Sequence, residues 1–279
     1  MINTSSLFIL FYMVVGSCAS TNANSLHNIL PRDSFLHIKK TVTVAVCSAS
    51  GCKEKTYKAI ASGSAVKTNQ AGTFVLTAAH VCDTTRRNDK ELKVTDSFQV
   101  TTLKGNKYSA TKLTYDNDID ACLLFVKELK LKPIKFADSA PKAGDKAYNI
   151  GAPLGIFAPG VVPILEGRYI GSDSVETALY SIPAAPGSSG SPILNTNGEL
   201  IGMIHSVYRR FAIISISVEY HALKKFLEKG YEKYKFYAMC DCKHFTKNKY
   251  KLSGWIGKLH SLQWNHKILC AIICVSEHK

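Results

Sequence analysis

Stretches in which apolar and polar residues alternate, or in which β-branched residues cluster, recur along most of the chain. Such stretches predict β-strands, and the Ser/Gly, Asn/Gly and Pro residues between them predict turns. Six strands are expected in the first half, at residues 41–46, 57–68, 73–81, 97–104, 107–115 and 120–127. Six more are expected in the second half, at residues 146–155, 161–171, 177–182, 191–195, 199–208 and 211–218. The pattern indicates an all-β protein.

A boundary separates the two runs of strands, where Pro133 and the segment ADSAPKAGD interrupt the pattern. Two runs of short strands with almost no helical periodicity predict two packed antiparallel six-stranded β-barrels. We expect the first barrel over about residues 35–132 and the second over about residues 140–229. Asn197-Gly198 predicts a two-residue hairpin within the second barrel.

One helix is expected at the C-terminal end of the second barrel. Its apolar face has helical spacing and consists of Ala222, Leu223, Phe226 and Leu227. Ser217 is of the type that caps helix N-termini, and Gly230 is of the type that ends helices. The predicted fold is therefore an all-β double barrel with a C-terminal helix.

The first 20 residues contain an apolar run, residues 7–16, that ends in small residues. The run is too short to span a bilayer comfortably and is typical of a signal peptide, which indicates export. Val15-Gly16-Ser17-Cys18 resembles a lipobox, in which Cys18 would carry lipid. Cleavage after Ala19 and an uncleaved anchor are the alternatives. Residues 21–34 are predicted to form a polar linker.

The nine cysteines agree with export, because removal or lipidation of Cys18 leaves eight, a number that disulfides can pair completely. Cys47 and Cys52 flank a Ser-Ala-Ser-Gly turn and are near enough in sequence to close a short hairpin. The pairing of the other cysteines stays open: these are Cys82, Cys122, Cys240, Cys242, Cys270 and Cys274.

The chain is basic, with 35 Lys and Arg against 21 Asp and Glu and a formal net charge of +14. Such a charge favours an acidic partner, for example nucleic acid or an anionic membrane. No nucleic-acid-binding motif accompanies the charge, so we prefer a generally basic surface and predict no nucleic-acid partner. No cofactor is predicted, and no metal site is assigned.

Residues 230–279 form a basic segment with both tryptophans and four cysteines. Three interpretations stay open, in decreasing order of preference. The segment is a small appendage on the second barrel, or it lies on an anionic membrane through the apolar run at residues 268–275, or it binds zinc. The spacings from Cys240 to Cys242 and from Cys270 to Cys274 are unusual for zinc, and exported chains more often form disulfides.

Residues 186–192 read Pro-Gly-Ser-Ser-Gly-Ser-Pro and lie between two predicted strands. Gly187 and Gly190 allow a sharp, exposed turn there. Acyl transfer uses such a turn, because it exposes a serine hydroxyl and directs backbone N–H groups at a developing oxyanion. The candidate nucleophile is Ser189, and the candidate oxyanion-hole residues are Gly187, Ser188 and Ser189. Taken alone, such a cluster is more often an ordinary loop.

Two upstream segments supply what a serine nucleophile needs, namely FVLTAAHVC with His80 and DIDACLLFVK with Asp120. The nucleophile needs a base within hydrogen-bond reach and a buried carboxylate that orients the base. Asp120 opens an apolar run, where burying a carboxylate is costly unless it has a partner. His80, which follows an apolar strand, is the natural candidate for that partner.

These segments, in the order His, Asp, Ser, resemble the chymotrypsin-like serine peptidases over about residues 35–228, and among them the HtrA (Deg) type. The segments ASGSAV, AGDKAYNIGAPLG and PAAPGSSGSPILNTNGELIG carry the closer resemblance, and Ser191 in place of the commoner glycine is similar to glutamyl endopeptidases. The resemblance implies Ser189 as nucleophile, His80 as general base and then acid, and Asp120 as orienting acid. Asp118 is the nearest competitor for the acid.

The sequence departs from the pattern in having no trypsin-style activation site before the first strand and no room for a PDZ domain after residue 229. The strands near residues 199–208 and 211–217 are expected to form walls of the S1 pocket, with His205, Ser206 and Ala212 as candidate substrate-binding residues. Glutamyl endopeptidases have a histidine near His205, but one residue out of register, which puts His205 on the opposite strand face. A preference for small or aliphatic side chains is therefore the default.

The sequence predicts an exported serine endopeptidase, periplasmic, secreted or membrane-anchored, that cleaves protein or peptide substrates through an acyl-enzyme. Membrane association is expected through lipidated Cys18 or the basic tail, and the oligomeric state is open. The alternative is a catalytically silent fold that serves as an exported peptide-binding or interaction module, and a third is a protease that processes only its own precursor. An intact hydrogen-bonded Ser189, His80 and Asp120 would favour the enzyme, and a displaced His80 the silent module.

Overall fold

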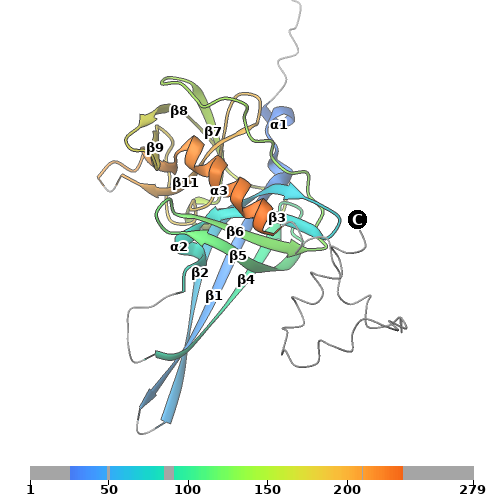
Figure 1. Ribbon diagram of the computed structural model, residues 1–279, viewed down its shortest axis with the longest axis vertical. Coiled ribbons are helices and arrows are strands. Elements are labelled where there is room, and N and C mark those ends of the chain that lie inside the picture. Colours follow the sequence, from blue (N-terminus) through green and yellow to red (C-terminus); the bar gives the residue numbers. More distant parts are fainter. Residues whose placement is uncertain (1–25, 49–50, 85–90, 209, 235–279) are drawn as a thin grey trace, which may run out of the picture.

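The protein consists of two β-barrels and a C-terminal helix (Figure 1). The computed structural model describes residues 26–48, 51–84, 91–208 and 210–234. The predicted signal peptide with Cys18, and the tail beyond residue 234, lie outside the described residues. Within the described part, no helix is long and apolar enough to cross a membrane.

Each barrel is a closed sheet of six antiparallel strands. The strand order of the first is β1-β2-β3-β6-β5-β4, and its strands are β1 (Phe35–Ser48), β2 (Gly51–Thr68), β3 (Gly72–Ala78), β4 (Glu91–Thr102), β5 (Lys107–Asp116) and β6 (Ala121–Lys127). The order of the second is β10-β11-β12-β9-β8-β7, and its strands are β7 (Lys146–Ile150), β8 (Ile164–Ser172), β9 (Thr177–Tyr180), β10 (Pro192–Leu194), β11 (Leu200–Val207) and β12 (Ser215–Val218). The predicted double barrel is confirmed.

Three strands of the first barrel, β1, β2 and β4, continue beyond it as a long ribbon (Figure 1). The backbone register of β1 and β2 places Cys47 opposite Cys52, as a hairpin closed near these residues requires. Residues 53–60 of β2 are exposed. The sequence pattern missed the start of β1, which includes the buried residues Phe35, Leu36 and Ile38. It also missed the first part of β2, because residues that are exposed along the ribbon have no reason to alternate in polarity.

Short helices occupy the connections: α1 (Leu26–Ile29), η1 (Arg32–Ser34), α2 (Ala79–Cys82) and η2 (Pro153–Gly155). The first two fall within the predicted polar linker, and Leu30 between them is buried in the core. This end of the chain therefore packs on the barrels rather than merely preceding them.

The predicted C-terminal helix is present as α3 (Tyr220–Lys233), but both predicted ends were wrong. Its N-cap is Glu219, whose carboxylate accepts hydrogen bonds from two backbone amides of the first turn. Ser217 still belongs to β12, where its buried hydroxyl accepts from the Met203 amide. The helix also runs past Gly230, which packs against β6: a β-carbon there would lie 2.9 Å from the Leu123 side chain.

The hairpin between β10 and β11 also differs from the prediction, since its loop is longer than two residues. The amide of Asn195 donates to the carbonyl of Glu199 at 2.9 Å, which leaves three residues in the loop. Gly198 takes the left-handed conformation with φ of +75°. An Asn-Gly pair thus marked the turn correctly, but not its length.

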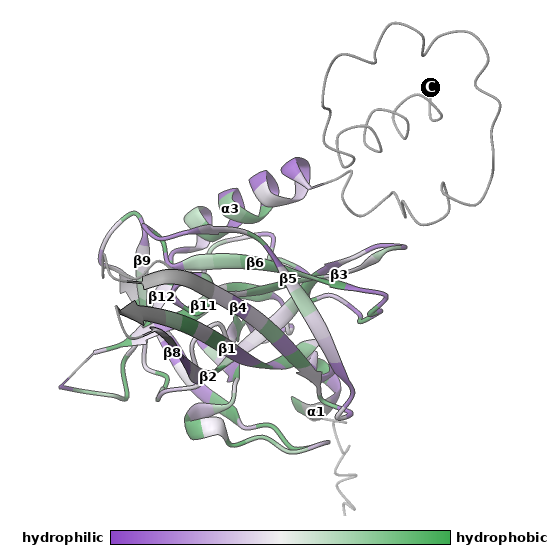
Figure 2. Ribbon diagram, turned by 90° about the horizontal axis from the view of Figure 1, so that it is seen from below, coloured by the Kyte–Doolittle hydropathy of each residue, from purple (hydrophilic) through white to green (hydrophobic). Residues whose placement is uncertain are grey.

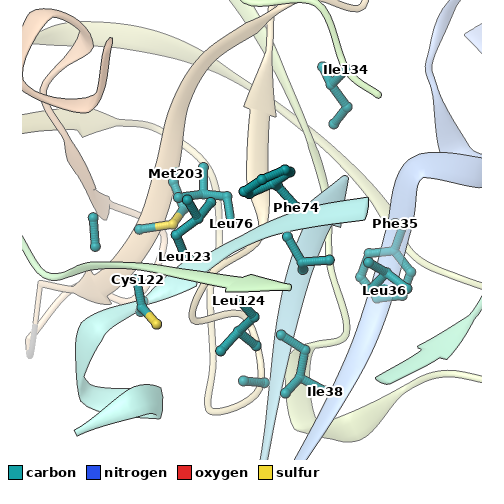
Figure 3. Packing of buried hydrophobic residues seen from close by; sticks show 14 of the residues in the cluster. Phe35, Leu36, Ile38, Phe74, Leu76, Cys122, Leu123, Leu124, Ile134 and Met203 are labelled. Atoms are coloured by element: carbon teal, nitrogen blue, oxygen red, sulfur yellow. The ribbon is translucent and has the colours of Figure 1, made fainter. Parts of the chain in front are cut away.

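The largest hydrophobic cluster joins the two barrels. It contains Phe74, Leu76 and Leu123 from the first barrel together with Met203 from β11 (Figure 3). Hydrophobic residues dominate β6, whereas α3 carries many hydrophilic ones (Figure 2). Because this cluster contains side chains of both barrels, residues at their junction are held in fixed relative positions.

Candidate active site

The imidazole of His80 faces Asp120 at the end of the first barrel. β3 is buried along its whole length and passes directly into α2, so His80 is the second residue of a short helical turn. Its Nδ1 lies 2.8 Å from Asp120 Oδ2, and its backbone amide donates to Asp120 Oδ1 at 2.9 Å. The side chain of His80 is half exposed. A proton on Nδ1 therefore leaves Nε2 free to accept one from outside.

Asp120 lies in the tight turn between β5 and β6, with φ of +51°. Burial raises its pKa, but the hydrogen bonds that it accepts from His205 and His80 outweigh burial and hold the pKa well below the ordinary value. The carboxylate is therefore ionised at neutral pH. The competing acid Asp118 is exposed, and its amide is bonded to Asp116, so the structure brings Asp120 and not Asp118 to His80.

The turn that carries His80 is fastened at its far end. Cys82 and Cys122 form a disulfide, which joins the residue two positions after His80 to the residue two positions after Asp120. Lys40 and Lys112 donate hydrogen bonds to carbonyls at the end of α2, at 2.6 and 3.0 Å. The sequence left the pairing of these cysteines open, because no local signal distinguishes it.

The Pro-Gly-Ser-Ser-Gly-Ser-Pro segment forms the sharp turn that its glycines predict. Gly187 and Gly190 have φ of +101° and +85°. A β-carbon on Gly190 would lie 2.3 Å from Thr77 Oγ1 and 2.2 Å from the carbonyl oxygen of Ser62. The backbone at Gly190 therefore packs directly against β3 at Thr77, three residues before His80. Ser189 is half-buried there.

Ser62 of β2 ties the turn to the first barrel through its backbone and its side chain. Its amide donates to the Ser189 carbonyl at 2.9 Å, and its hydroxyl donates to the Gly187 carbonyl at 2.8 Å. The same hydroxyl accepts from the Ala152 amide at 3.0 Å. Ser62 is completely buried. Sequence reasoning missed it, because a serine in an alternating strand gives no sign of a partner 125 residues away.

The backbone amides of the turn differ in what they bind. The Leu154 amide donates to the Pro186 carbonyl at 2.7 Å, and because a trans peptide is planar the Gly187 N–H must point the opposite way. Within the described ranges, the amides of Gly187 and Ser189 donate no hydrogen bond to the protein. The Ser188 amide donates to the Ala185 carbonyl at 2.9 Å. Of the three predicted oxyanion-hole residues, Ser188 is thus the one whose N–H donates inside the turn.

His205, a candidate substrate-binding residue, lies beside Asp120. Its side chain is 13% exposed, and its Nδ1 is 3.4 Å from Asp120 Oδ2, so the imidazole faces the acid and not an open pocket. The cause is the strand register, which a β-bulge between Ile204 and Ser206 shifts locally. The one-residue offset from the glutamyl endopeptidase pattern was the signal for this. Ser206 and Ala212 are exposed, and their contact with substrate stays a prediction.

Two closed six-stranded barrels with a His-Asp pair and a Gly-Ser turn at their junction define the chymotrypsin-like class of proteins. The model of the trypsin-like peptidase domain family matches residues 61–203, just over half of the chain. The chain belongs to this family.

Among curated relatives, a probable periplasmic serine protease do/HhoA-like from Haemophilus influenzae is 35% identical over 149 residues, which are 50% of this chain and 30% of that protein. The periplasmic serine endoprotease DegP of Escherichia coli K12 is 30% identical over 159 residues, which are 55% of this chain and 31% of that protein. The matches thus span less than a third of these relatives.

A crystal structure of a serine endoprotease from Yersinia pestis has the same fold, with a TM-score of 0.54 and 20% identity over 72% of this chain and 63% of that one. A crystal structure of Rv3671c from Mycobacterium tuberculosis has a TM-score of 0.51 and 18% identity over 71% of this chain and 87% of that one.

Proposed function

We propose that the chain is a serine endopeptidase that hydrolyses peptide bonds through an acyl-enzyme on Ser189. The observation that carries the proposal is the double hydrogen bonding of His80 to one ionised carboxylate, next to a turn in which the Gly187 and Ser189 amides donate to none of the described residues. Those are the parts that acyl transfer needs: an oriented base and donors for an oxyanion. The alternative, a catalytically silent fold, would not need His80 to keep this position, so the bonds of His80 to Asp120 favour the enzyme.

In the first step, Ser189 Oγ attacks the carbonyl carbon of the substrate while His80 Nε2 takes the hydroxyl proton. Asp120 stabilises the resulting imidazolium and keeps its Nδ1–H directed at the carboxylate. The Gly187 and Ser189 amides donate to the oxyanion, where each such donor contributes about 10²- to 10³-fold in turnover. His80 then protonates the leaving amine, and water releases the acyl group by the reverse sequence.

The comparisons support a wider proposal about location and substrate. Relatives named periplasmic serine proteases, and the apolar N-terminal run, favour an exported enzyme that acts on proteins. We propose residues 35–229 as the peptidase domain and residues 1–20 as its signal peptide, with a lipid on Cys18 or the basic tail as the link to a membrane.

The test is labelling with a fluorophosphonate probe, which reacts only with an activated serine, followed by mass spectrometry of the labelled peptide. We expect the oxidised wild-type chain to be labelled at Ser189 and Ser189→Ala to be unlabelled. Ser172→Ala, which removes an exposed serine of β8, is the matched control and should label as the wild type does. A folded wild type without label would contradict the proposal.

A further inference from the structure

Two histidines from different barrels meet on one carboxylate oxygen. His80 Nδ1 reaches Asp120 Oδ2 from the first barrel at 2.8 Å, and His205 Nδ1 reaches the same oxygen from β11 of the second barrel at 3.4 Å. The other oxygen, Oδ1, accepts from the His80 backbone amide. The proposed acid is therefore held on both oxygens, and one of its partners belongs to the barrel that carries the proposed nucleophile.

The surroundings of His205 favour one protonation state and one tautomer of its imidazole. Its Nε2 is buried, and none of the described residues gives it a hydrogen-bond partner. A proton on Nε2 would be a buried donor without an acceptor, and a bare Nδ1 would set its lone pair against the Asp120 carboxylate. The neutral ring with its proton on Nδ1 avoids both costs and donates to Oδ2.

We infer that His205 is a positioning residue for the proposed acid Asp120, and that it acts as a neutral Nδ1–H donor to Oδ2. This inference rests on the proposed function. The bond fixes the plane of the carboxylate and draws negative charge from the oxygen that also pairs with His80. Without it, Asp120 can rotate, and its charge concentrates on the bond to His80.

Two consequences follow for catalysis. A rotating acid holds the His80 ring less well, which lowers turnover without changing the pocket that binds substrate. A more concentrated charge on Asp120 makes His80 more basic, so the acid side of the rate profile moves to higher pH. A residue that merely fills space would produce neither the second effect nor a difference between a donor and a non-donor at the same position.

The experiment compares His205→Leu, which removes the donor, with His205→Asn, whose side-chain amide can donate from near the place of Nδ1. Fluorophosphonate labelling and peptide hydrolysis are measured from pH 5 to pH 9, with the active fraction determined by burst titration. For His205→Leu we expect kcat per active site to fall about 10- to 100-fold, with KM unchanged and the acid limb at higher pH. We expect His205→Asn to restore most of the rate. His221→Leu changes an exposed histidine of α3 and should behave as the wild type.

If His205→Leu does not fold, His205→Gln replaces it, because its amide stands nearer the place of Nε2 and cannot donate from that of Nδ1. Equal losses in the donor and non-donor variants, with an unshifted pH profile, would overturn the inference while the labelled wild type upholds the proposed function. An unlabelled wild type would overturn the proposed function and, with it, this role of His205.

Discussion

Replacing Ser62 by alanine is the sharpest test of how the two barrels are joined at the site. The hydroxyl donates to the Gly187 carbonyl at 2.8 Å and accepts from the Ala152 amide at 3.0 Å, and all three residues are buried. Ser62→Ala therefore leaves one acceptor and one donor without a protein partner at the barrel junction.

The magnitude follows from these two groups. Each buried polar group that loses its partner costs about 1–3 kcal/mol, and water entering the gap favours the lower half of that range. We expect a loss of about 2–4 kcal/mol in the free energy of unfolding. For a chain of this size, the unfolding midpoint should fall by roughly 4–16 °C, at about 2–4 °C per kcal/mol. Since the hydroxyl also holds Gly187, whose amide is a proposed oxyanion donor, labelling of Ser189 should slow by about 10- to 100-fold.

Ser64→Ala is the matched control, because Ser64 is on the same strand and equally buried, but its hydroxyl has no hydrogen-bond partner among the described residues. It should be neutral or slightly stabilising. The measurements are thermal unfolding and the rate of fluorophosphonate labelling. If the two variants unfold within about 1 °C of each other and label equally fast, the reasoning about the Ser62 bridge is wrong.

Three further outcomes are expected. Gly190→Ala should abolish labelling and lower stability by about 3 kcal/mol or more, as seen by thermal unfolding, because its β-carbon would lie 2.2 Å from the Ser62 carbonyl at a φ of +85°. Because the pKa of Asp120 is held below 3.8, its stabilisation is present at neutral pH and is lost as the pH falls below about 4. The free energy of unfolding measured in urea should therefore fall with decreasing pH more steeply in the wild type than in Asp120→Asn. The kcat of this variant at neutral pH should also be about 10⁴-fold lower. Replacing both Cys82 and Cys122 by alanine should lower the free energy of unfolding in urea by about 4 kcal/mol, since the disulfide closes a loop of 40 residues. A loss below about 1 kcal/mol would count against a stabilising role of the disulfide.

The sequence by itself determined the strands and the three segments that carry His80, Asp120 and Ser189. Alternation of apolar and polar residues is a local property of a half-buried strand, so twelve strands and the break between the barrels could be predicted in place. Gly187 and Gly190 are also local signals, because they mark backbone conformations that other residues rarely adopt. Asp120 stood out because an acid at the start of an apolar run needs a partner.

Only the tertiary structure decided the contacts between distant segments. The bond of Ser62 to Gly187 and the contact of His205 with Asp120 depend on how the barrels close on each other and on a bulge in β11. The capping of α3 by Glu219 depended on where β12 ends. Strand periodicity tells which face a side chain occupies but not what lies opposite that face, because the opposite residue is chosen by register and packing over long sequence distances.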